Sequence, residues 1–406
     1  MPIEQVQAIG RRAAAHGVTV MHLPPFLAAL QRQIAGTDMR ALRVGPLIGR
    51  PELHVVSRQA AEAVAGKRVL VTGAGGSIGS ELCRQVAGFG PETLLMLDHD
   101  ESNLHRLQLD IWGEAEMDSE NTVVADIRDR ERILQIFRDH RPEVVFHAAA
   151  LKHLPVLERN PCEGVKSNVK GTENLVEAAI AYDVEKFVLI STDKAANPAS
   201  VLGATKRLAE VLLQDSRESS STVLCAVRFG NVLGSRGSLL HVVREQLAAG
   251  APITVTHPEV TRFFMTIEEA VGLVLEAARM ADCTATYVLD MGEPVKIVDL
   301  VRNFAESLNV RDPQFRFTGL RPGEKLAEVL FATGEESLPT DHPRISMVRA
   351  GAPRPGFRAR LQDLYDAASH NRPDEVFAHL RRLVPEYAPT PGLVSAAANT
   401  PYPDDY

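Results

Sequence analysis

The chain has 406 residues, of which 45% are hydrophobic and 24% are charged, a composition typical of a soluble globular protein with one large domain or two domains. Its formal net charge of −8 argues against a nucleic-acid partner and against an anionic membrane surface. No run approaches the roughly 18 apolar residues of a membrane span, so we expect a soluble, cytoplasmic protein.

The first 65 residues hold too little apolar sequence for a core of their own. A helical pattern over Gln5–His16 leads into a strand-like Val18–Met21, and a passage rich in glycine and proline follows. We expect residues 1–65 to form an N-terminal appendage that packs on the next domain or on a second copy of the chain. We also expect a homo-oligomer, a dimer or larger.

From Lys67, short apolar runs alternate with longer amphipathic stretches, which is typical of an α/β protein. The pattern predicts a Rossmann-type doubly wound parallel sheet in residues 66–230 and a smaller lobe, mainly substrate-binding, in 231–350. Residues 351–406 are expected to form C-terminal helices and a tail that is disordered beyond Thr390. The predicted strands are Arg68–Thr72, Thr93–Leu97, Thr122–Ala125, Val144–His147, Phe187–Ser191 and Val223–Arg228. Helix-length segments lie between these strands, among them Ser80–Ala87, Asp129–Arg138, Pro161–Ala181 and Ala204–Asp215.

The four cysteines are scattered and form no C-x-x-C pair, which argues against a disulfide framework and against a metal site. We expect all of them to be small apolar core residues. They are Cys83, Cys162, Cys225 and Cys283.

A glycine loop, residues 73–79, connects the first predicted strand to a helix. Its glycines allow a tight turn and a close approach to a pyrophosphate, which the helix N-terminus also attracts. Asp98, at the end of the next strand, can accept hydrogen bonds from a ribose diol and would repel a 2′-phosphate, which favours NAD over NADP. The residues expected to contact NAD are Gly73, Gly75, Gly76, Ser77, Ile78, Gly79, Asp98, Asp126, Ile127, Ala148 and Ala149. The last four close the third and fourth strands, where an acid can face the adenine and small residues let the backbone lie against the cofactor.

The sharpest chemical signal is Thr192-Asp193-Lys194, directly after the fifth predicted strand. Ligands of open α/β sheets bind at the carboxyl ends of the strands. A hydroxyl, a carboxylate and an amine in adjacent positions there can take up and deliver protons on one substrate. We therefore expect catalytic residues here, although an Asp-Lys dipeptide is usually a solvated loop pair.

Seven sequence segments carry a family resemblance. They are Thr72–Leu82, Ala148–His153, Ser191–Ala195, Gly203–Arg207, Arg228–Ser235, Thr261–Thr266 and Arg321–Lys325. In this order they resemble the extended short-chain dehydrogenase/reductase superfamily, and more narrowly the CapD-like UDP-N-acetylglucosamine 4,6-dehydratases of bacterial capsular polysaccharide biosynthesis. That family is usually membrane-anchored, and residues 1–65 resemble the end of the region before its catalytic domain, so we expect a soluble form without the anchor.

The resemblance implies a lyase with a UDP-sugar substrate. Hydride passes from carbon 4 to NAD, water is eliminated across carbons 5 and 6, and hydride returns to carbon 6, which leaves a UDP-4-keto-6-deoxy sugar. In the family pattern Lys194 is the base at carbon 5, Asp193 is the acid for the departing hydroxyl, and Thr192 hydrogen-bonds the oxygen on carbon 4. Such a lysine needs a pKa lowered by burial or by a neighbouring cation.

The sequence departs from most of the superfamily at Leu202, where a tyrosine usually stands four residues before the motif lysine, here Lys206. Leucine cannot take a proton, which leaves open the base for the carbon-4 hydroxyl, with Asp193 as the candidate. Lys206 is expected to keep its other role, a hydrogen bond to the nicotinamide ribose. In lacking this tyrosine, the sequence also resembles the subgroup of the family that retains the configuration at carbon 5.

The family pattern also implies a set of residues for the UDP-sugar, with arginines for the diphosphate because a planar fork donates twice to phosphate oxygens. The set is Lys152, His153, Asn231, Arg262, Arg321 and Glu324.

Two alternatives to the dehydratase function stay open. A UDP-sugar 4-epimerase shares the fold and the cofactor but leaves Asp193 and Lys194 idle, whereas a catalytically inactive NAD-binding protein is favoured by Leu202.

Overall fold

The structure, a computed structural model, describes residues 21–22, 40–41, 56–114, 119–217, 221–235, 237, 239–308, 310–349 and 353–389. The predicted helix Gln5–His16, most of the predicted strand Val18–Met21 and the tail beyond Thr390 lie outside these residues. Met21–His22 (β1) pairs antiparallel with Arg40–Ala41 (β2).

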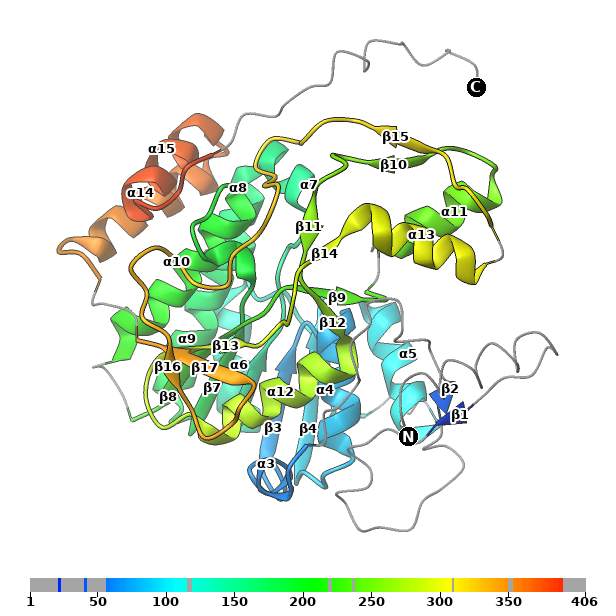
Figure 1. Cartoon of the computed structure of the whole chain (residues 1–406). Coiled ribbons are helices and arrows are strands. Elements are labelled where there is room, and N and C mark those ends of the chain that lie inside the picture. Colours follow the sequence, from blue (N-terminus) through cyan, green and yellow to red (C-terminus); the bar gives the residue numbers. More distant parts are fainter. Residues whose placement is uncertain are drawn as a thin grey trace.

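A nine-stranded sheet with the order β16-β17-β13-β8-β7-β6-β3-β4-β5 forms the centre of the molecule (Figure 1). Its strands from β13 to β5 are parallel, and β17 and β16 complete one edge in antiparallel pairing. The strands are β3 (Arg68–Thr72), β4 (Thr93–Asp98), β5 (Thr122–Val124), β6 (Val144–His147), β7 (Lys186–Ile190), β8 (Val223–Arg228), β13 (Ala285–Leu289), β16 (Leu338–Pro339) and β17 (Ile345–Val348). The six predicted strands are all present within one residue at either end, and the predicted doubly wound α/β class is confirmed.

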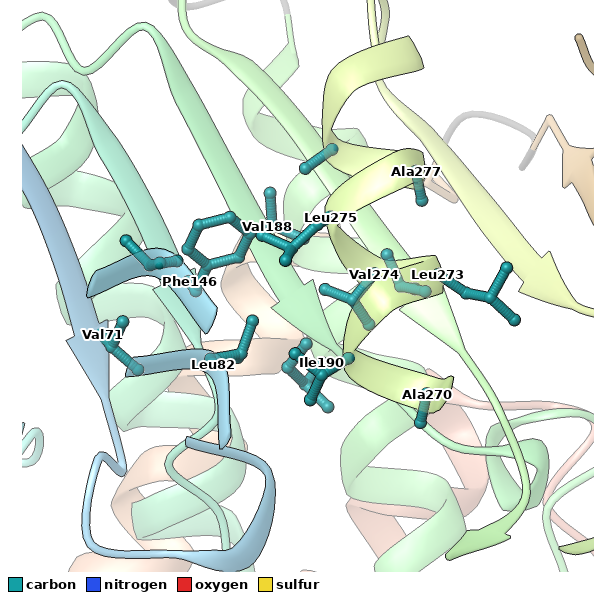
Figure 2. Packing of buried hydrophobic residues seen from close by; sticks show 14 of the residues in the cluster. Val71, Leu82, Phe146, Val188, Ile190, Ala270, Leu273, Val274, Leu275 and Ala277 are labelled. Atoms are coloured by element: carbon teal, nitrogen blue, oxygen red, sulfur yellow. The ribbon is translucent and has the colours of Figure 1, made fainter. Parts of the chain in front are cut away.

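Each strand alternates its side chains between two cores because helices cover both faces of the sheet. Val69 and Val71 of β3 pack in the first core, whereas Leu70 packs in the second. Figure 2 shows the first core, which contains strand residues such as Phe146 together with Leu82 and Val274 from two helices. The helices of this face are α3 (Arg58–Glu62), α4 (Ser77–Ala87), α5 (Glu101–Trp112) and α12 (Ile267–Met280). The helices of the other face are α6 (Arg130–His140), α9 (Gly171–Ala181) and α10 (Val201–Ser216).

All four predicted helices are helical in the structure but differ in their bounds or regularity. Helix α4 begins at Ser77 instead of Ser80, and α6 covers Arg130–His140 instead of Asp129–Arg138. Helix α10 begins at Val201 instead of Ala204, because the Ser200 side chain accepts a hydrogen bond from Gly203 N and caps the helix earlier. The predicted helix Pro161–Ala181 is divided into α8 (Pro161–Gly164), the π-helical turn η3 (Val165–Lys170) and α9. Turns of this kind are frequent at functional sites.

A third core lies between α8, η3, α10 and a C-terminal helical hairpin, α14 (Phe357–Ser369) and α15 (Pro373–Leu383). Leu202 and Leu208 of α10 share this core with Leu361 and Leu380 of the hairpin. The C-terminal hairpin therefore packs directly behind the helix that carries Lys206 (Figure 1).

The second lobe has its own core between α11 (Leu239–Ala248), α13 (Ile297–Ser307) and short paired strands. The pairs are β9 (Asn231–Leu233) with β12 (Phe264–Thr266), β11 (Thr261–Arg262) with β14 (Val295–Lys296), and β10 (Ile253–Val255) with β15 (Phe315–Phe317). The predicted domain boundaries stay a prediction, and strands β13, β16 and β17 return from this part of the chain to the main sheet.

Three of the four cysteines, Cys83, Cys162 and Cys225, are buried as predicted. Cys283 is exposed, so the prediction that all four are core residues is wrong for this position, which lies in the turn between α12 and β13. Among the residues that the structure describes, no helix is both long and apolar enough to cross a membrane.

Candidate active site

The glycine loop between β3 and α4 is shaped by close backbone contacts. Gly73 has a φ of +68°, and a Cβ atom there would lie 2.5 Å from the backbone nitrogen of Ala149. A Cβ at Gly79 would lie 2.0 Å from the carbonyl oxygen of Gly73. Gly76, the N-cap residue of α4, supplies no capping side chain. The loop therefore has room for backbone only, and the start of α4 is suited to an anionic ligand.

Asp98, the last residue of β4, is held beside this loop. Its Oδ2 accepts a hydrogen bond from Gly75 N at 2.8 Å, and its Oδ1 accepts one from Asp100 N at 3.0 Å. The side chain is 9% exposed. Two backbone donors thus fix the direction of this carboxylate, which is the ribose acceptor predicted from the sequence.

A crevice of about 490 Å³ opens at the carboxyl ends of β3, β4, β5 and β6. The loop after β5 is fixed by α9, because Asn174 Nδ2 donates to Ile127 O at 2.9 Å and a Cβ at Gly171 would lie 2.6 Å from Ile127 Cδ1. Arg128 Nη1 on this loop lies 3.0 Å from Glu163 Oε2 on α8. Since both side chains line the crevice, their ion pair lies at its wall.

Eight of the residues predicted to contact NAD line this crevice: Gly73, Gly75, Gly76, Asp98, Asp126, Ile127, Ala148 and Ala149. Ser77, Ile78 and Gly79 form the first turn of α4 outside the lining, and Lys206 lies on α10. A helix N-terminus, a fixed ribose acceptor and walls of small residues are what a dinucleotide requires, so the residues present fit one.

Asp126, the acid expected to face the adenine, is already engaged by Arg128. Arg128 Nη2 and Nε donate to Asp126 Oδ2 at 2.6 and 2.8 Å. Burial acts to raise the pKa of Asp126, but the hydrogen bonds from Arg128 outweigh burial and lower it. Asp126 is therefore a fixed negative charge at the crevice wall.

His147 ends β6 under the crevice and is fully buried. Its Nδ1 lies 2.8 Å from Thr72 Oγ1, and its Nε2 lies 2.9 Å from Thr172 Oγ1. The Thr172 hydroxyl donates to Asn168 O at 2.8 Å, so it accepts from Nε2–H, which leaves Nδ1 to accept from Thr72. Burial, and then the charge of Lys206, lower the pKa of His147 well below its usual value, in agreement with this neutral tautomer.

Asn168, in the π-helical turn η3, was not identified from the sequence. Its Oδ1 accepts a hydrogen bond from Leu151 N at 2.8 Å, and its Nδ2 donates one to Leu151 O at 3.0 Å. Its Nδ2 also donates to Thr205 Oγ1 on α10 at 3.1 Å. Asn168 thus connects the loop after β6 to the helix of Lys206, and the break in helical periodicity that places it there leaves no motif in the sequence.

The three catalytic candidates after β7 form one hydrogen-bonded cluster. Asp193 Oδ1 accepts from Thr192 Oγ1 and from Lys194 Nζ, both at 2.9 Å. Lys194 Nζ also donates to Asn231 Oδ1 at 3.1 Å, so a residue predicted to bind substrate joins the cluster. Asp193 is 0% exposed, and its Oδ2 has no hydrogen-bond partner among the described residues. A carboxylate with one engaged and one open buried oxygen is suited to proton transfer.

The unpartnered oxygen of Asp193, Oδ2, faces Gly230. Gly230 lies within one of the family segments but was not named from the sequence as a site residue. A Cβ at Gly230 would lie 3.2 Å from Asp193 Oδ2 and 2.8 Å from Phe263 Cβ. A side chain at position 230 would therefore displace either the carboxylate or Phe263, and glycine keeps this conformation of Asp193 accessible.

Lys206 and Leu202 face different surroundings although both lie on α10. Burial lowers the pKa of Lys206 to about 8, although Glu210 acts to raise it. Leu202 is buried and belongs to the apolar core that contains the C-terminal hairpin. The position where a tyrosine is usual is therefore filled by an apolar packing residue.

The residues predicted for the UDP-sugar are brought together only in part. Arg262 Nη2 lies 3.2 Å from Glu324 Oε1, which also accepts from Thr256 Oγ1 at 2.9 Å. Arg321 is exposed, and its backbone N–H donates to Glu324 Oε2 at 3.1 Å. Lys152 and His153 are exposed after β6, where His153 precedes helix α7 (Leu154–Arg159).

A Rossmann sheet with a dinucleotide-type crevice and a proton-transfer cluster at adjacent strand ends defines a relative of the nucleotide-sugar dehydratases and epimerases. The chain belongs to the polysaccharide biosynthesis protein family, whose model matches residues 69–350. This confirms the resemblance that the sequence motifs indicated.

Three curated relatives illustrate the range of similarity. The chain is 42% identical over 349 residues to the probable polysaccharide biosynthesis protein EpsC of Bacillus subtilis, covering 85% of this chain and 58% of EpsC. It is 42% identical over 336 residues to the capsular polysaccharide biosynthesis protein CapD of Staphylococcus aureus, covering 82% of this chain and 56% of CapD. It is 30% identical over 278 residues to an inverting UDP-N-acetylglucosamine 4,6-dehydratase of Campylobacter jejuni, covering 67% of this chain and 80% of that enzyme. The chain thus spans little more than half the length of EpsC and CapD.

Two solved structures share the fold. Pen from Bacillus thuringiensis is 32% identical with a TM-score of 0.65, covering 71% of this chain and 90% of Pen. A UDP-glucose 4-epimerase from Thermus thermophilus, solved in complex with NAD, is 24% identical with a TM-score of 0.55, covering 66% of this chain and 91% of that one.

Proposed function

We propose that the chain is an NAD-dependent nucleotide-sugar 4,6-dehydratase that acts on UDP-N-acetylglucosamine. The observation that carries the proposal is the cluster of Thr192, Asp193 and Lys194, in which one carboxylate oxygen accepts from the threonine hydroxyl and from the lysine Nζ while the other is buried and open. Eliminating water needs an acid and a base in one site, and this cluster offers both.

NAD bound in the crevice would supply hydride acceptance at carbon 4 and hydride return at carbon 6. The glycine loop and the N-terminus of α4 would hold its diphosphate, and Asp98 would accept from the adenosine ribose. Lys206 would hydrogen-bond the nicotinamide ribose. The fit of the crevice and the NAD complex of the Thermus thermophilus epimerase support this cofactor.

The chain's own residues would then move the protons. Thr192 would hydrogen-bond the oxygen on carbon 4. Asp193 would take the proton of that hydroxyl, because the side chain of Leu202 cannot accept a proton. Lys194 would remove the proton on carbon 5, Asp193 would protonate the hydroxyl that leaves carbon 6, and Lys194 would give a proton back to carbon 5 when hydride is delivered to carbon 6. Arg262 and Arg321, with Glu324, would bind the UDP end, while Lys152, His153 and Asn231 would face the sugar.

The decisive experiment is incubation of the protein with UDP-N-acetylglucosamine carrying deuterium on carbon 4, without any added oxidant. We expect a product lighter by one water, with the deuterium recovered on carbon 6, by mass and proton spectra. An isomer of unchanged mass would instead make the protein a 4-epimerase, the first alternative that the sequence leaves open. Bound NAD without turnover of any UDP-sugar would indicate a catalytically inactive binding protein.

Three finer parts of the proposal need separate measurements. The Leu202 position supports a product that retains its configuration at carbon 5, whereas the Campylobacter jejuni relative is an inverting enzyme, and the proton spectrum of the product distinguishes the two. A homo-oligomer is tested by light scattering on a sizing column. A cytoplasmic location is tested by cell fractionation.

A further inference from the structure

Residues 321–335, which we call the strap, run from the second lobe to the strand-end site. At the lobe end, the strap residue Glu324 accepts hydrogen bonds from Arg262 and Thr256 at 3.2 and 2.9 Å. The strap therefore begins at the residues expected to bind the UDP end of the substrate.

The strap then contacts the turn formed by residues 191–200, which carries the catalytic candidates. Thr333 N donates to Asn197 Oδ1 at 2.9 Å, and Asn197 Nδ2 donates to Thr333 Oγ1 at 3.1 Å. Asn197 has a φ of +46°, a left-handed conformation that asparagine tolerates better than most residues. A Cβ at the strap residue Gly323 would lie 2.8 Å from Ser200 Cβ, so backbone packs closely here as well.

Beneath these contacts lies an arginine that is 0% exposed, Arg228 at the end of β8. Its Nη1 donates to Glu335 Oε2 at 2.8 Å and to Leu330 O at 2.9 Å, so two strap residues hold one side of the guanidinium. Its Nη2 donates to Glu210 Oε2 on α10 at 2.7 Å. Burial acts to lower the pKa of Arg228, but Glu210 and Glu335 outweigh burial and raise it.

Glu210 carries this connection to the catalytic cluster. Its Oε1 accepts from Ser191 Oγ at 2.6 Å, and Ser191 directly precedes Thr192. Glu210 is itself buried, and although burial acts to raise its pKa, Arg228 outweighs this and lowers it. The carboxylate is therefore charged, and a continuous chain of short polar contacts runs from the strap to the turn.

The charges of this network are balanced. Arg207 Nη1 lies 3.2 Å from Glu210 Oε2 and 3.0 Å from Glu335 Oε1, so two arginines face two buried carboxylates. Loss of one carboxylate leaves an uncompensated buried cation, which the structure can relieve only by moving or hydrating its neighbours.

We propose that Glu335 is a positioning residue that locks the strap to Arg228 and, through Glu210 and Ser191, fixes the Thr192–Asp193–Lys194 cluster. This rests on the proposed function. The second lobe and the catalytic cluster then form one unit, so the bound sugar is held at a constant distance from the acid and the base.

The test is Glu335→Gln, which keeps the shape and removes the charge. We expect kcat to fall by about 10-fold or more while KM changes by less than about 3-fold, because misplacement of catalytic groups by fractions of an ångström has effects of this size. We also expect faster amide hydrogen exchange in residues 191–197 and unchanged NAD content. Glu335→Asp, which restores the charge at a shorter reach, should recover part of the kcat.

The matched control is Glu386→Gln, because Glu386 contacts the same Arg207, at 3.4 Å, from a side chain that is 37% exposed. It should leave kcat and the exchange of residues 191–197 unchanged. If Glu335→Gln does not fold, Thr333→Val removes the side-chain hydrogen bond of the exposed junction without a change in charge and should raise the same exchange to a smaller extent.

Wild-type kcat and wild-type exchange in Glu335→Gln would overturn the proposal, and so would a lowered melting temperature with unchanged kcat per folded molecule. Absence of dehydratase turnover in the wild-type protein would instead refute the proposed function. The exchange comparison between Glu335→Gln and Glu386→Gln decides the positioning role in that case as well.

Discussion

The cofactor crevice and the catalytic cluster lie at the same edge of one sheet but are built differently. The crevice is formed by short segments at consecutive strand ends, and its tightest contacts involve backbone atoms, as at Gly73 and Ala149. The cluster depends on side chains from distant segments, including Lys194, Asn231 and the buried Arg228. The crevice should therefore be sensitive to a single added carbon atom, and the cluster to a single lost charge.

The largest expected effect is at the cluster. Lys194→Ala removes the proposed carbon-5 base and should lower turnover by about 1,000-fold or more while NAD stays bound, because a positioned base contributes factors of this order. Product formation and the NAD content of the purified protein measure the two parts.

Leu202→Ala is the matched control for Lys194→Ala, since it removes an apolar side chain from α10, the helix that follows the turn of Lys194. It should lower stability through a cavity against the C-terminal hairpin, by about 2–3 kcal/mol, while turnover per folded molecule changes little. Equal losses of turnover in the two variants would show that position 202 participates in the chemistry.

The next effect concerns Lys206 and pH. Burial lowers its pKa to about 8 in the folded protein from the ordinary value of 10.5. Between these values the unfolded chain keeps a proton that the folded chain has lost, so this residue adds stability as pH rises through the window, by roughly 3 kcal/mol in total. Urea unfolding of the nucleotide-free protein at pH 7 and pH 10 should show this gain relative to Lys206→Met. Parallel pH profiles for the two proteins would contradict it.

At the crevice, Gly73→Ala should weaken NAD binding by about 30-fold, because its Cβ would lie 2.5 Å from Ala149 N and must displace the loop. Gly66→Ala is the control, since Gly66 has nearly the same φ, +67°, but open space around its Cβ. Calorimetric titration with NAD should separate the steric effect from the cost of a left-handed backbone, which both variants share. Similar affinities in the two variants would argue against a dinucleotide at Gly73.

The smallest effect is expected for the ion pair between Arg128 and Glu163 at the crevice wall. Glu163→Gln should speed NAD release by less than about 5-fold, because the side chains of Arg128 and Glu163 are 43% and 40% exposed and such pairs contribute little in water. The effect should vanish in high salt, as stopped-flow displacement of NAD would measure.

The parallel half of the fold could be predicted because each of its strands is a continuous apolar run between helices. Strand β13 is also apolar, but its place in the sheet depends on pairing between distant segments. It pairs parallel with β8 and antiparallel with β17. Helix α5 was not named individually from the sequence, although Asp100, whose Oδ1 accepts from Asn103 N, is an ordinary start signal.

The candidate site shows the same division. Thr192, Asp193 and Lys194 were found because they are adjacent and follow a predicted strand. Glu335 is separated from Arg228 by 107 positions and belongs to no glycine-rich or catalytic motif, so only the folded chain brings the two together. A single sequence offers no sign of such a pairing.

The hydrogen bonds of His147 determine how this protein should respond to histidine-directed acylating reagents. Both ring nitrogens are engaged and the ring is fully buried, so it presents no free lone pair to such a reagent. His99, whose side chain is 81% exposed beside Asp98, and the exposed His153 remain open to modification. Inactivation by acylation would therefore report on the rim of the site, and protection by nucleotide or by nucleotide sugar would distinguish its two sides.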